Sequence, residues 1–470
     1  MNKRSLGFYI LLLLILILFI WKDGHSQTFD TAYARKLQNA LNLIKNNSNI
    51  VGISAAVYVP GQGTWTGTAG ITEPNVNLTP DMVFSAGSIT KNFVSATILQ
   101  LEEQDSLSLN DPIYKWLPRY TNIDSTITIR RLLNHTSGIY NFTDNSAFLN
   151  AVNANASRIW EPEESLQYVL APYFVQGAGW RYSNTNYLLL SMIIKKITGK
   201  TFGQEIHSRF FTPLNMTGSF IEIEDTLTAP WVHNWVDLNG DGILDDASFI
   251  SQNSFASSTV GAGGVISRPQ NLVTWLRNLY KPGVILSQAS LNSMLTFTNA
   301  NISGSTGYGL GTMRYSVGGK TCWGHAGNSF GHSAVAMYYP VDSICISLMM
   351  NIDINTGHIG ISFMNTVLDN RPIGIENISN EIPDKFNLHQ NYPNPFNPET
   401  NIKFDIASQG DVKLVVYNSL GKEVQNIFSG KLSAGSYSYK WSAANFPSGV
   451  YFYKLQTQNS VFVKKMLLVK

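Results

Sequence analysis

The chain has 470 residues, of which 44% are hydrophobic, so its length and composition exclude a wholly disordered protein. It carries 33 Lys and Arg against 31 Asp and Glu, and no segment concentrates the basic residues. This balance argues against nucleic acid as a partner, because such binding needs basic side chains that neutralise several phosphates.

The N-terminal segment has the layout of a secretory signal. Lys3 and Arg4 precede an apolar run over residues 10–21, and small and polar residues follow up to Ser26. We therefore expect a signal peptide over residues 1–26. The run is shorter than the roughly 20 residues that cross a bilayer, so we expect no membrane span in the mature chain. An uncleaved anchor is the alternative.

Strand and helix patterns alternate over residues 27–370, which we expect to form one domain. Residues 51–60 and 64–70 read as a hairpin, residues 88–104 and 187–198 read as helices, and three strands are expected near the end, at residues 321–325, 333–339 and 343–350. Strands at both ends with helices between them predict an α+β fold, in which an antiparallel sheet lies beside a helical subdomain.

Ser88 and Lys91 form a Ser-x-x-Lys motif at the start of the first of these helices. Residues three apart share one side of a helix, so the Lys91 amine is expected one turn from the Ser88 hydroxyl. Burial would lower the pKa of that amine and let it accept the serine proton. The alternative is that Ser88 only caps the helix and Lys91 is solvated. A second match, Ser419 and Lys422, lies in a turn between strands.

Tyr182 and Asn184 could supply a second proton-handling group and a substrate-binding amide. The Tyr-x-Asn pattern occurs three times, and only this copy immediately precedes a helix, which would hold it rigidly. The other copies begin at Tyr120, in a loop, and at Tyr392, near the C-terminal domain. The alternative for Tyr182 is a surface tyrosine that packs beside Trp180.

An acidic stretch over residues 237–245 resembles the start of a calcium-binding loop. Its oxygen ligands would be Asp237, Asn239, Asp241 and Asp245, but Ser248 stands where such a loop requires a glutamate. We therefore expect an acidic hairpin turn and no metal site, with calcium as the alternative.

His325 and Gly327 stand at the end of a predicted strand. Gly327 would let a substrate approach the strand closely, and His325 is expected to contact that substrate. The backbone N–H groups of Ser88 and Asn328 are our candidates for an oxyanion hole, which needs two donors aimed at one point. Nearby, Cys322 and Cys345 would lie about 10 Å apart on alternate strands, too far for a disulfide. We expect two buried free thiols.

Together these motifs resemble the class C β-lactamase and D-Ala-D-Ala carboxypeptidase family. The likeness runs over residues 39–351 and rests on four segments, FSAGSITK (84–91), LLNHTSG (132–138), YSNTNY (182–187) and GHAG (324–327). It implies the penicillin-recognising fold, no cofactor or metal, and an acyl-enzyme on Ser88. It also places the family's lysine and tyrosine on Lys91 and Tyr182, and its substrate-contacting asparagine on Asn184. His135, in the second segment, is expected to be structural.

One departure from the family guides the choice of reaction. Class C β-lactamases usually carry Lys where this chain has His325, and a neutral histidine offers a substrate carboxylate little charge. His there is similar to D-amino-acid peptidases and esterases, so we expect cleavage of D-amino-acid peptides or esters. A class C-like β-lactamase is the alternative within the same mechanism. A catalytically silent protein that binds peptidoglycan fragments is the alternative from another class.

The C-terminal part changes character after residue 370. Residues 371–390 are expected to be a linker, and short alternating strands over residues 391–470 predict a small all-β sandwich. This region resembles a type A sorting domain of type 9 secretion, through NYPNPFNP (391–398), SGVY (448–451) and the final lysines Lys464, Lys465 and Lys470. The resemblance implies the type 9 secretion machinery as a partner and a secreted or cell-surface location. The alternative is a carbohydrate-binding or adhesive sandwich.

Overall fold

The computed structural model describes residues 29–371, 375–379, 381–444 and 446–470. They fall into two compact units that divide after Asn370. The expected signal peptide lies outside the described residues. No helix in the described ranges combines the length and apolar character needed to cross a membrane.

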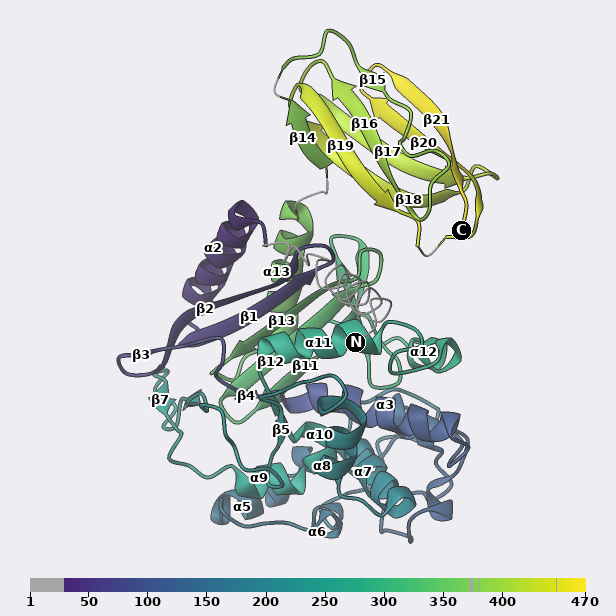
Figure 1. The fold of residues 1–470 in the computed structure, drawn as a ribbon. Helices are drawn as coiled ribbons and strands as arrows, with labels where there is room; N and C mark the ends of the chain where they lie inside the picture. The colour runs from purple at the N-terminus through teal and green to yellow at the C-terminus, as the bar shows by residue number, and fades with distance from the viewer. Residues whose placement is uncertain (1–28, 372–374, 380, 445) are drawn as a thin grey trace, which may run out of the picture. The chain divides into compact units, whose positions relative to one another are not determined.

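The first unit contains an antiparallel sheet built from both ends of the unit (Figure 1). The strand order is β3-β2-β1-β13-β12-β11-β10-β9. The strands are β1 (Gly52–Val59), β2 (Gly63–Glu73), β3 (Val76–Asn77), β9 (Gly307–Tyr308), β10 (Met313–Val317), β11 (Lys320–Ser329), β12 (His332–Tyr339) and β13 (Ile344–Met350).

Both faces of this sheet are covered, which explains why its central strands lack polar alternation. Every residue of β12 and β13 is buried. On one face, α2 (Thr31–Asn47) and α13 (Thr356–Asn370) pack in one hydrophobic cluster with the sheet. On the other face, α11 (Pro269–Leu279) contacts β1, β12 and β13 (Figure 1). A strand buried on both sides reads as a continuous apolar run, as these strands do.

The helical portion shares the second hydrophobic cluster with α11. Phe93, on α3, stacks on Trp275 of α11 with ring centroids 3.9 Å apart, and this contact fixes α3 against the covered sheet. The helices are α3 (Thr90–Glu103), α4 (Ile129–Leu133), α5 (Ser146–Ala154), α6 (Pro162–Leu166), α7 (Asn184–Thr198), α8 (Phe202–Ile206), α9 (Asn253–Ser258), α10 (Val260–Gly263) and α12 (Gln288–Met294), with shorter turns at η1 (Gly87–Ile89), η2 (Ile113–Lys115), η3 (Phe142–Asp144) and η4 (His207–Phe211).

Two small sheets complete the first unit. One joins β4 (Phe84–Ser85), β8 (Val265–Ser267) and β5 (Phe220–Ile221), and the other is the hairpin of β6 (Trp235–Val236) and β7 (Asp245–Asp246). The predicted α+β class, with an antiparallel sheet beside a helical subdomain, is confirmed. Cys322 and Cys345 are buried and free, as the strand spacing predicts.

The second unit is all β, with two four-stranded sheets around one hydrophobic cluster. Its strands are β14 (Ile375–Ser379), β15 (Asn387–Leu388), β16 (Glu399–Ile406), β17 (Gly410–Asn418), β18 (Glu423–Leu432), β19 (Gly435–Ser442), β20 (Gly449–Thr457) and β21 (Val461–Leu468). Residues 371–390, expected to be a linker, instead contribute β14, which pairs with β19, and β15, which pairs with β16. Both strands lie at the edges of their sheet and are short. The polar sequence with its prolines gives no strand pattern, so these two strands could not be predicted from it.

Candidate active site

A tight turn carries Ser88 between β4 and α3. Gly87 has a φ of 51°, and a Cβ atom there would lie 2.6 to 2.8 Å from the backbone of Asn328, on β11. Only glycine fits this conformation and this close approach. Ser88 therefore lies in the η1 turn, and α3 begins at Thr90. The sequence places the helix start two residues earlier, at Ser88.

Lys91 brings three chain segments together through its amine. The side chain is fully buried, and Nζ lies 2.9 Å from Ser88 Oγ, 2.8 Å from Asn184 Oδ1 and 2.8 Å from the carbonyl oxygen of Ala262. Burial lowers the pKa of Lys91 well below its usual value. A neutral amine has two N–H donors and one lone pair. Asn184 and Ala262 can accept the two N–H groups, which leaves the lone pair for the Ser88 hydroxyl.

Tyr182 completes the group around Ser88. Its side chain is hydrogen-bonded to Ser88, and Lys91 Nζ lies 4.9 Å from the centre of its ring. Burial raises the pKa of the phenol, and the hydrogen bond to Ser88 opposes this rise. The structure thus brings Ser88, Lys91 and Tyr182 into contact. Of the other Tyr-x-Asn matches, Tyr120 packs against the helical core and Tyr392 is exposed in the second unit.

Asn184, the predicted substrate-binding amide, already has protein partners on both atoms of its side-chain amide. Oδ1 accepts from Lys91, and Nδ2 donates to Thr143 Oγ1 over 3.0 Å. Its backbone N–H donates to Asn141. Asn184 therefore holds the Lys91 amine in place, and a role in binding substrate stays a prediction.

His325 differs from its predicted position. We expect a side chain that contacts substrate, but the ring is fully buried and its Nε2 lies 2.9 Å from the hydroxyl of Tyr308. Burial is the main cause that lowers the pKa of His325 to about 3, and a hydrogen bond to the Ala326 carbonyl opposes this shift. The imidazole is therefore neutral at pH 7, as the sequence predicts, but it faces Tyr308 and not solvent.

Gly327 allows β11 to lie directly against the Ser88 turn. A Cβ atom at Gly327 would lie 2.1 Å from the carbonyl oxygen of Ala86 and 2.8 Å from the backbone nitrogen of Ser88. The Asn328 backbone nitrogen would lie 2.7 Å from a Cβ atom at Gly87. The two predicted oxyanion-hole donors thus lie on neighbouring segments beside the Ser88 hydroxyl. Their role in stabilising a charge stays a prediction.

A cluster of buried rings surrounds Tyr182. His135 lies with its ring centre 4.4 Å from that of Tyr182 and 4.7 Å from that of Tyr308. Its Nδ1 atom is contacted by the Ser183 N–H over 3.3 Å and by the Asn186 amide over 3.1 Å. Sequence reasoning missed Tyr308 altogether. For His135 the sequence predicts only a structural role.

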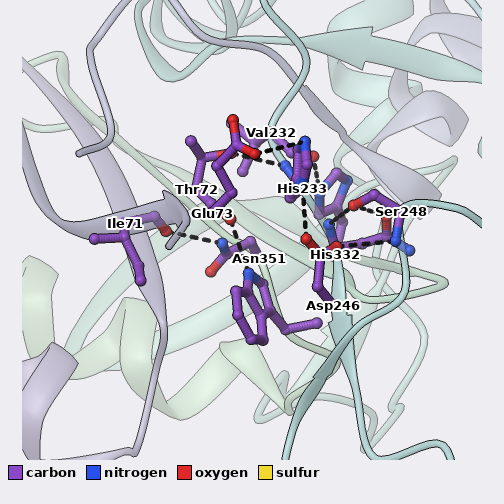
Figure 2. A network of polar contacts seen from close by, with 11 residues as sticks. Ile71, Thr72, Glu73, Val232, His233, Asp246, Ser248, His332 and Asn351 are labelled. Atoms are coloured by element: carbon purple, nitrogen blue, oxygen red, sulfur yellow. Dashed lines mark hydrogen bonds and ion pairs between the residues drawn. The ribbon is translucent and has the colours of Figure 1, made fainter. Parts of the chain in front are cut away.

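A separate polar network ties the β6–β7 hairpin to the main sheet (Figure 2). His233 Nδ1 lies 2.8 Å from Asp246, its backbone N–H donates to Thr72, and Glu73 lies 3.8 Å from its Nε2. Ser248 bonds to Asp246 (Figure 2). It also bonds to Asn234. These contacts fix the chain at the point where it leaves β7 toward α9.

The acidic loop between β6 and β7 uses its side chains on its own backbone. Asp237 accepts hydrogen bonds from the N–H groups of Gly240, Asp241 and Gly242. Asn239 accepts from Asp241, and Asp245 accepts from Leu238. Across the described ranges, no group of three His, Cys, Asp or Glu residues is arranged to hold a metal ion. These side chains accept hydrogen bonds within an acidic turn, and the expected absence of a metal stays a prediction.

Comparison with known proteins places both units. The β-lactamase family profile matches residues 34–359, and the profile of the secretion system C-terminal sorting domain matches residues 390–470. Penicillin-binding protein 4* of Bacillus subtilis is 27% identical over 274 residues, which cover 56% of this chain and 59% of that protein. The teichoic acid D-alanine hydrolase of Staphylococcus aureus (strain MRSA252) is 25% identical over 43% of this chain and 46% of that protein. The chain thus spans less than two thirds of these curated relatives.

Solved structures agree with this assignment. A D-stereospecific amidohydrolase from Streptomyces sp. is 30% identical with a TM-score of 0.62, over 70% of this chain and 98% of that chain. The D-amino acid amidase of Ochrobactrum anthropi SV3, in complex with D-phenylalanine, shares the fold at 24% identity with a TM-score of 0.65, over 72% of this chain and 99% of that chain. The chain therefore belongs to the β-lactamase family of serine hydrolases and ends in a C-terminal sorting domain that directs type 9 secretion.

Proposed function

We propose that this protein is an exported serine hydrolase that forms an acyl-enzyme on Ser88 and cleaves peptides or esters of D-amino acids. The observation that carries the proposal is the contact of one hydroxyl with both a buried amine and a phenol, at Ser88, Lys91 and Tyr182. The named relatives that act on D-amino acid amides and on D-alanine of teichoic acid support the substrate class.

The first half of the reaction acylates Ser88. The neutral Lys91 amine takes the hydroxyl proton as Ser88 Oγ attacks the substrate carbonyl carbon. The carbonyl oxygen gains a negative charge, which the N–H groups of Ser88 and Asn328 would stabilise. Tyr182 delivers a proton to the departing nitrogen or oxygen, and the proton on Lys91 then passes to the Tyr182 phenolate. The bond to the leaving group breaks, and the acyl group stays on Ser88.

The second half removes the acyl group. A water molecule takes the place of the leaving group and attacks the ester carbonyl, while the Tyr182 and Lys91 pair accepts its proton. Ser88 Oγ leaves and regains a proton from Lys91. The products are a carboxylic acid and the starting enzyme.

Intact-mass analysis after treatment with a fluorophosphonate tests this proposal. We expect the native chain to gain one phosphonyl adduct and Ser88→Ala to gain none. A catalytically silent protein would gain no adduct in either form, and an equal adduct in both would place the reactive group elsewhere.

A class C-like β-lactamase remains the alternative within the same mechanism. The neutral, buried His325 argues against it, because no fixed positive charge stands where those enzymes carry a lysine. Turnover of nitrocefin at rates comparable to hydrolysis of D-amino acid esters would favour the β-lactamase.

Export completes the proposal. The sorting domain directs the protein through type 9 secretion to the cell surface or beyond. Residues 1–26 would first carry the chain into the periplasm as a cleaved signal peptide, leaving a catalytic domain over residues 27–370. Mass spectrometry of the secreted protein would locate the mature N-terminus, and a mature chain that retains residues 10–21 would contradict this step.

A further inference from the structure

A pocket of about 390 Å³ opens beside Asn328. Apolar side chains from three segments form most of its wall, namely Leu149, Val152, Ile250, Phe255 and Phe330. Ile250 follows Ser248, which bonds to Asp246 in the network of Figure 2 and also to Asn234. A pocket of this size and character suits an aliphatic or aromatic side chain.

Asn328 connects this pocket to the reaction centre. Its backbone nitrogen lies against Gly87, one residue before Ser88, and its side chain lines the pocket. The Nδ2 atom donates to Asp353 Oδ1 over 2.7 Å, to Ser333 Oγ over 2.9 Å and to the carbonyl oxygen of Ile354 over 2.9 Å. Asp353 also lines the pocket, and it is hydrogen-bonded to the side chain of the residue whose backbone N–H is the predicted oxyanion-hole donor.

Asp353 has no cationic partner within the described part of the chain. Its carboxylate accepts a hydrogen bond from the Asn328 amide, and the pocket wall contains no Lys, Arg or His. Partial burial raises the pKa of the Asp353 carboxyl, and the hydrogen bond from Asn328 opposes this rise. A positively charged partner stabilises the ionised form of a partly buried carboxylate more than that of a fully solvated one.

The reaction centre, in contrast, offers little to a negatively charged substrate group. Burial favours the neutral forms of Lys91 and His325. Of the nearby arginines, Arg181 pairs with Asp144 and stacks on Tyr173, and Arg314 bonds to Thr306. A substrate carboxylate would find no free cation among these groups, whereas a substrate ammonium would find Asp353.

We infer that Asp353 and the apolar pocket beside Asn328 select acyl groups that carry an apolar side chain and a free α-ammonium group. This inference rests on the proposed function and narrows it. The preferred substrates are aminoacyl amides and esters with an unblocked amino end, and the released acid is a free amino acid. Peptides that must be recognised through a terminal carboxylate are disfavoured.

Protection of Ser88 from a fluorophosphonate tests the inference on the full chain. The two competitors are D-phenylalaninamide and N-acetyl-D-phenylalaninamide, which share the side chain and carbonyl but differ in charge. We expect D-phenylalaninamide to slow labelling at a concentration about tenfold lower than the N-acetyl compound requires. A tenfold difference in affinity corresponds to one charge-assisted hydrogen bond. Asp353→Asn keeps an oxygen acceptor for Asn328 but loses the charge, so it should abolish the difference.

The matched control is Asp81→Asn, which removes the same charge from an exposed carboxylate that pairs with Arg268. It should keep the wild-type preference. Equal protection by the two amides, protection by neither, or an unchanged preference in Asp353→Asn would each overturn the inference while Ser88 still reacts. Failure of the fluorophosphonate to modify Ser88 would overturn the proposed function itself, so the two failures are distinguishable.

Discussion

The Lys91 amine nitrogen lies 2.9 Å from the Ser88 hydroxyl oxygen, although the two residues bracket the junction between a 3₁₀ turn and a helix. The Asn184 and Ala262 oxygens occupy the other two directions around that nitrogen. The serine is therefore the one partner from which a neutral Lys91 can draw a proton.

Replacement of Lys91 by Met should remove this proton acceptor with little change in volume. We expect the rate of Ser88 phosphonylation to fall by about 10² to 10⁴-fold, the usual contribution of a general base. The labelling reaction is stopped at successive times, and intact-mass analysis gives the fraction of phosphonylated protein and hence the rate. Lys195→Met, at the solvent-facing end of α7, is the control and should label like the wild type. Equal labelling of Lys91→Met and wild type would remove Lys91 from the mechanism.

The pH dependence of labelling follows from the same burial. Because the pKa of Lys91 is well below 10.5, the amine is neutral over a range in which an exposed lysine is charged. Labelling should therefore stay fast as the pH falls from 10 and decline only when the pH passes below the lowered pKa. A rate that rises tenfold per pH unit up to pH 10 would show an ordinary, solvated lysine.

Replacement of Tyr182 by Phe should impair protonation of the leaving group more than the attack of Ser88 on the carbonyl. The ring would keep its packing against His135, with centroids 4.4 Å apart, while the hydroxyl bonded to Ser88 is lost. We expect turnover of a D-amino acid amide to fall by about 10² to 10⁴-fold, because amides need a protonated leaving group. An ester with an acidic leaving alcohol should lose much less. An equal loss on both substrates would argue against this role.

The sequence is sufficient to predict much of this site because the motifs lie on regular elements. Ser88 and Lys91 share one turn, and Tyr182 directly precedes α7, so local spacing places them. The strand at His325 is likewise predictable from its apolar neighbours. The sequence predicts that a substrate approaches the strand at Gly327, whereas the structure places the backbone of the Ser88 turn there.

Other features depend on contacts between segments that no local pattern reveals. His325 is buried by Tyr308, which comes from the two-residue strand β9 at the far edge of the sheet. The pocket beside Asn328 is assembled from α5, the segment that leads into α9, the end of β11 and the loop after β13. Asp353 has no motif of its own, so its place next to Asn328 appears only in the fold.

Substitution of Gly327 by Ala should displace the Ser88 turn without removing any side chain from the hydrophobic core. The new methyl group would lie 2.1 Å from the Ala86 carbonyl oxygen and 2.8 Å from the Ser88 nitrogen, so the Ser88 turn would have to move. Loss of one oxyanion-hole donor costs about 10² to 10³-fold in turnover. Gly263→Ala is the control, since its methyl group meets nothing closer than 3.8 Å. Comparable activity of Gly327→Ala and wild type would show that β11 does not form the oxyanion hole.

Stability at acid pH should depend on His332, which is buried between β4 and the segment before β6. Its Nδ1 accepts from the Ser85 N–H. Its Nε2 donates to the Val232 carbonyl (Figure 2). Burial lowers the pKa of His332 to about 3, and these hydrogen bonds do not reverse the shift. Below pH 6.5 the unfolded chain binds a proton that the folded chain cannot, so stability must fall as the pH drops from 6.5 toward 3. At pH 5 this histidine alone costs about 2 kcal/mol relative to pH 7.

His332→Asn keeps one acceptor and one donor but does not titrate in this range. Between pH 7 and pH 5 the free energy of unfolding of the variant should therefore fall by about 2 kcal/mol less than that of the wild type. This holds even if the variant is less stable at pH 7, because only the change with pH reports proton binding by His332. Urea unfolding of the full chain at the two pH values, followed by tryptophan fluorescence, measures it. His358→Asn, at an exposed position of α13, should show the wild-type drop. An equal drop in wild type and His332→Asn would mean that His332 takes up a proton in the folded protein, and its two hydrogen bonds would then need another explanation.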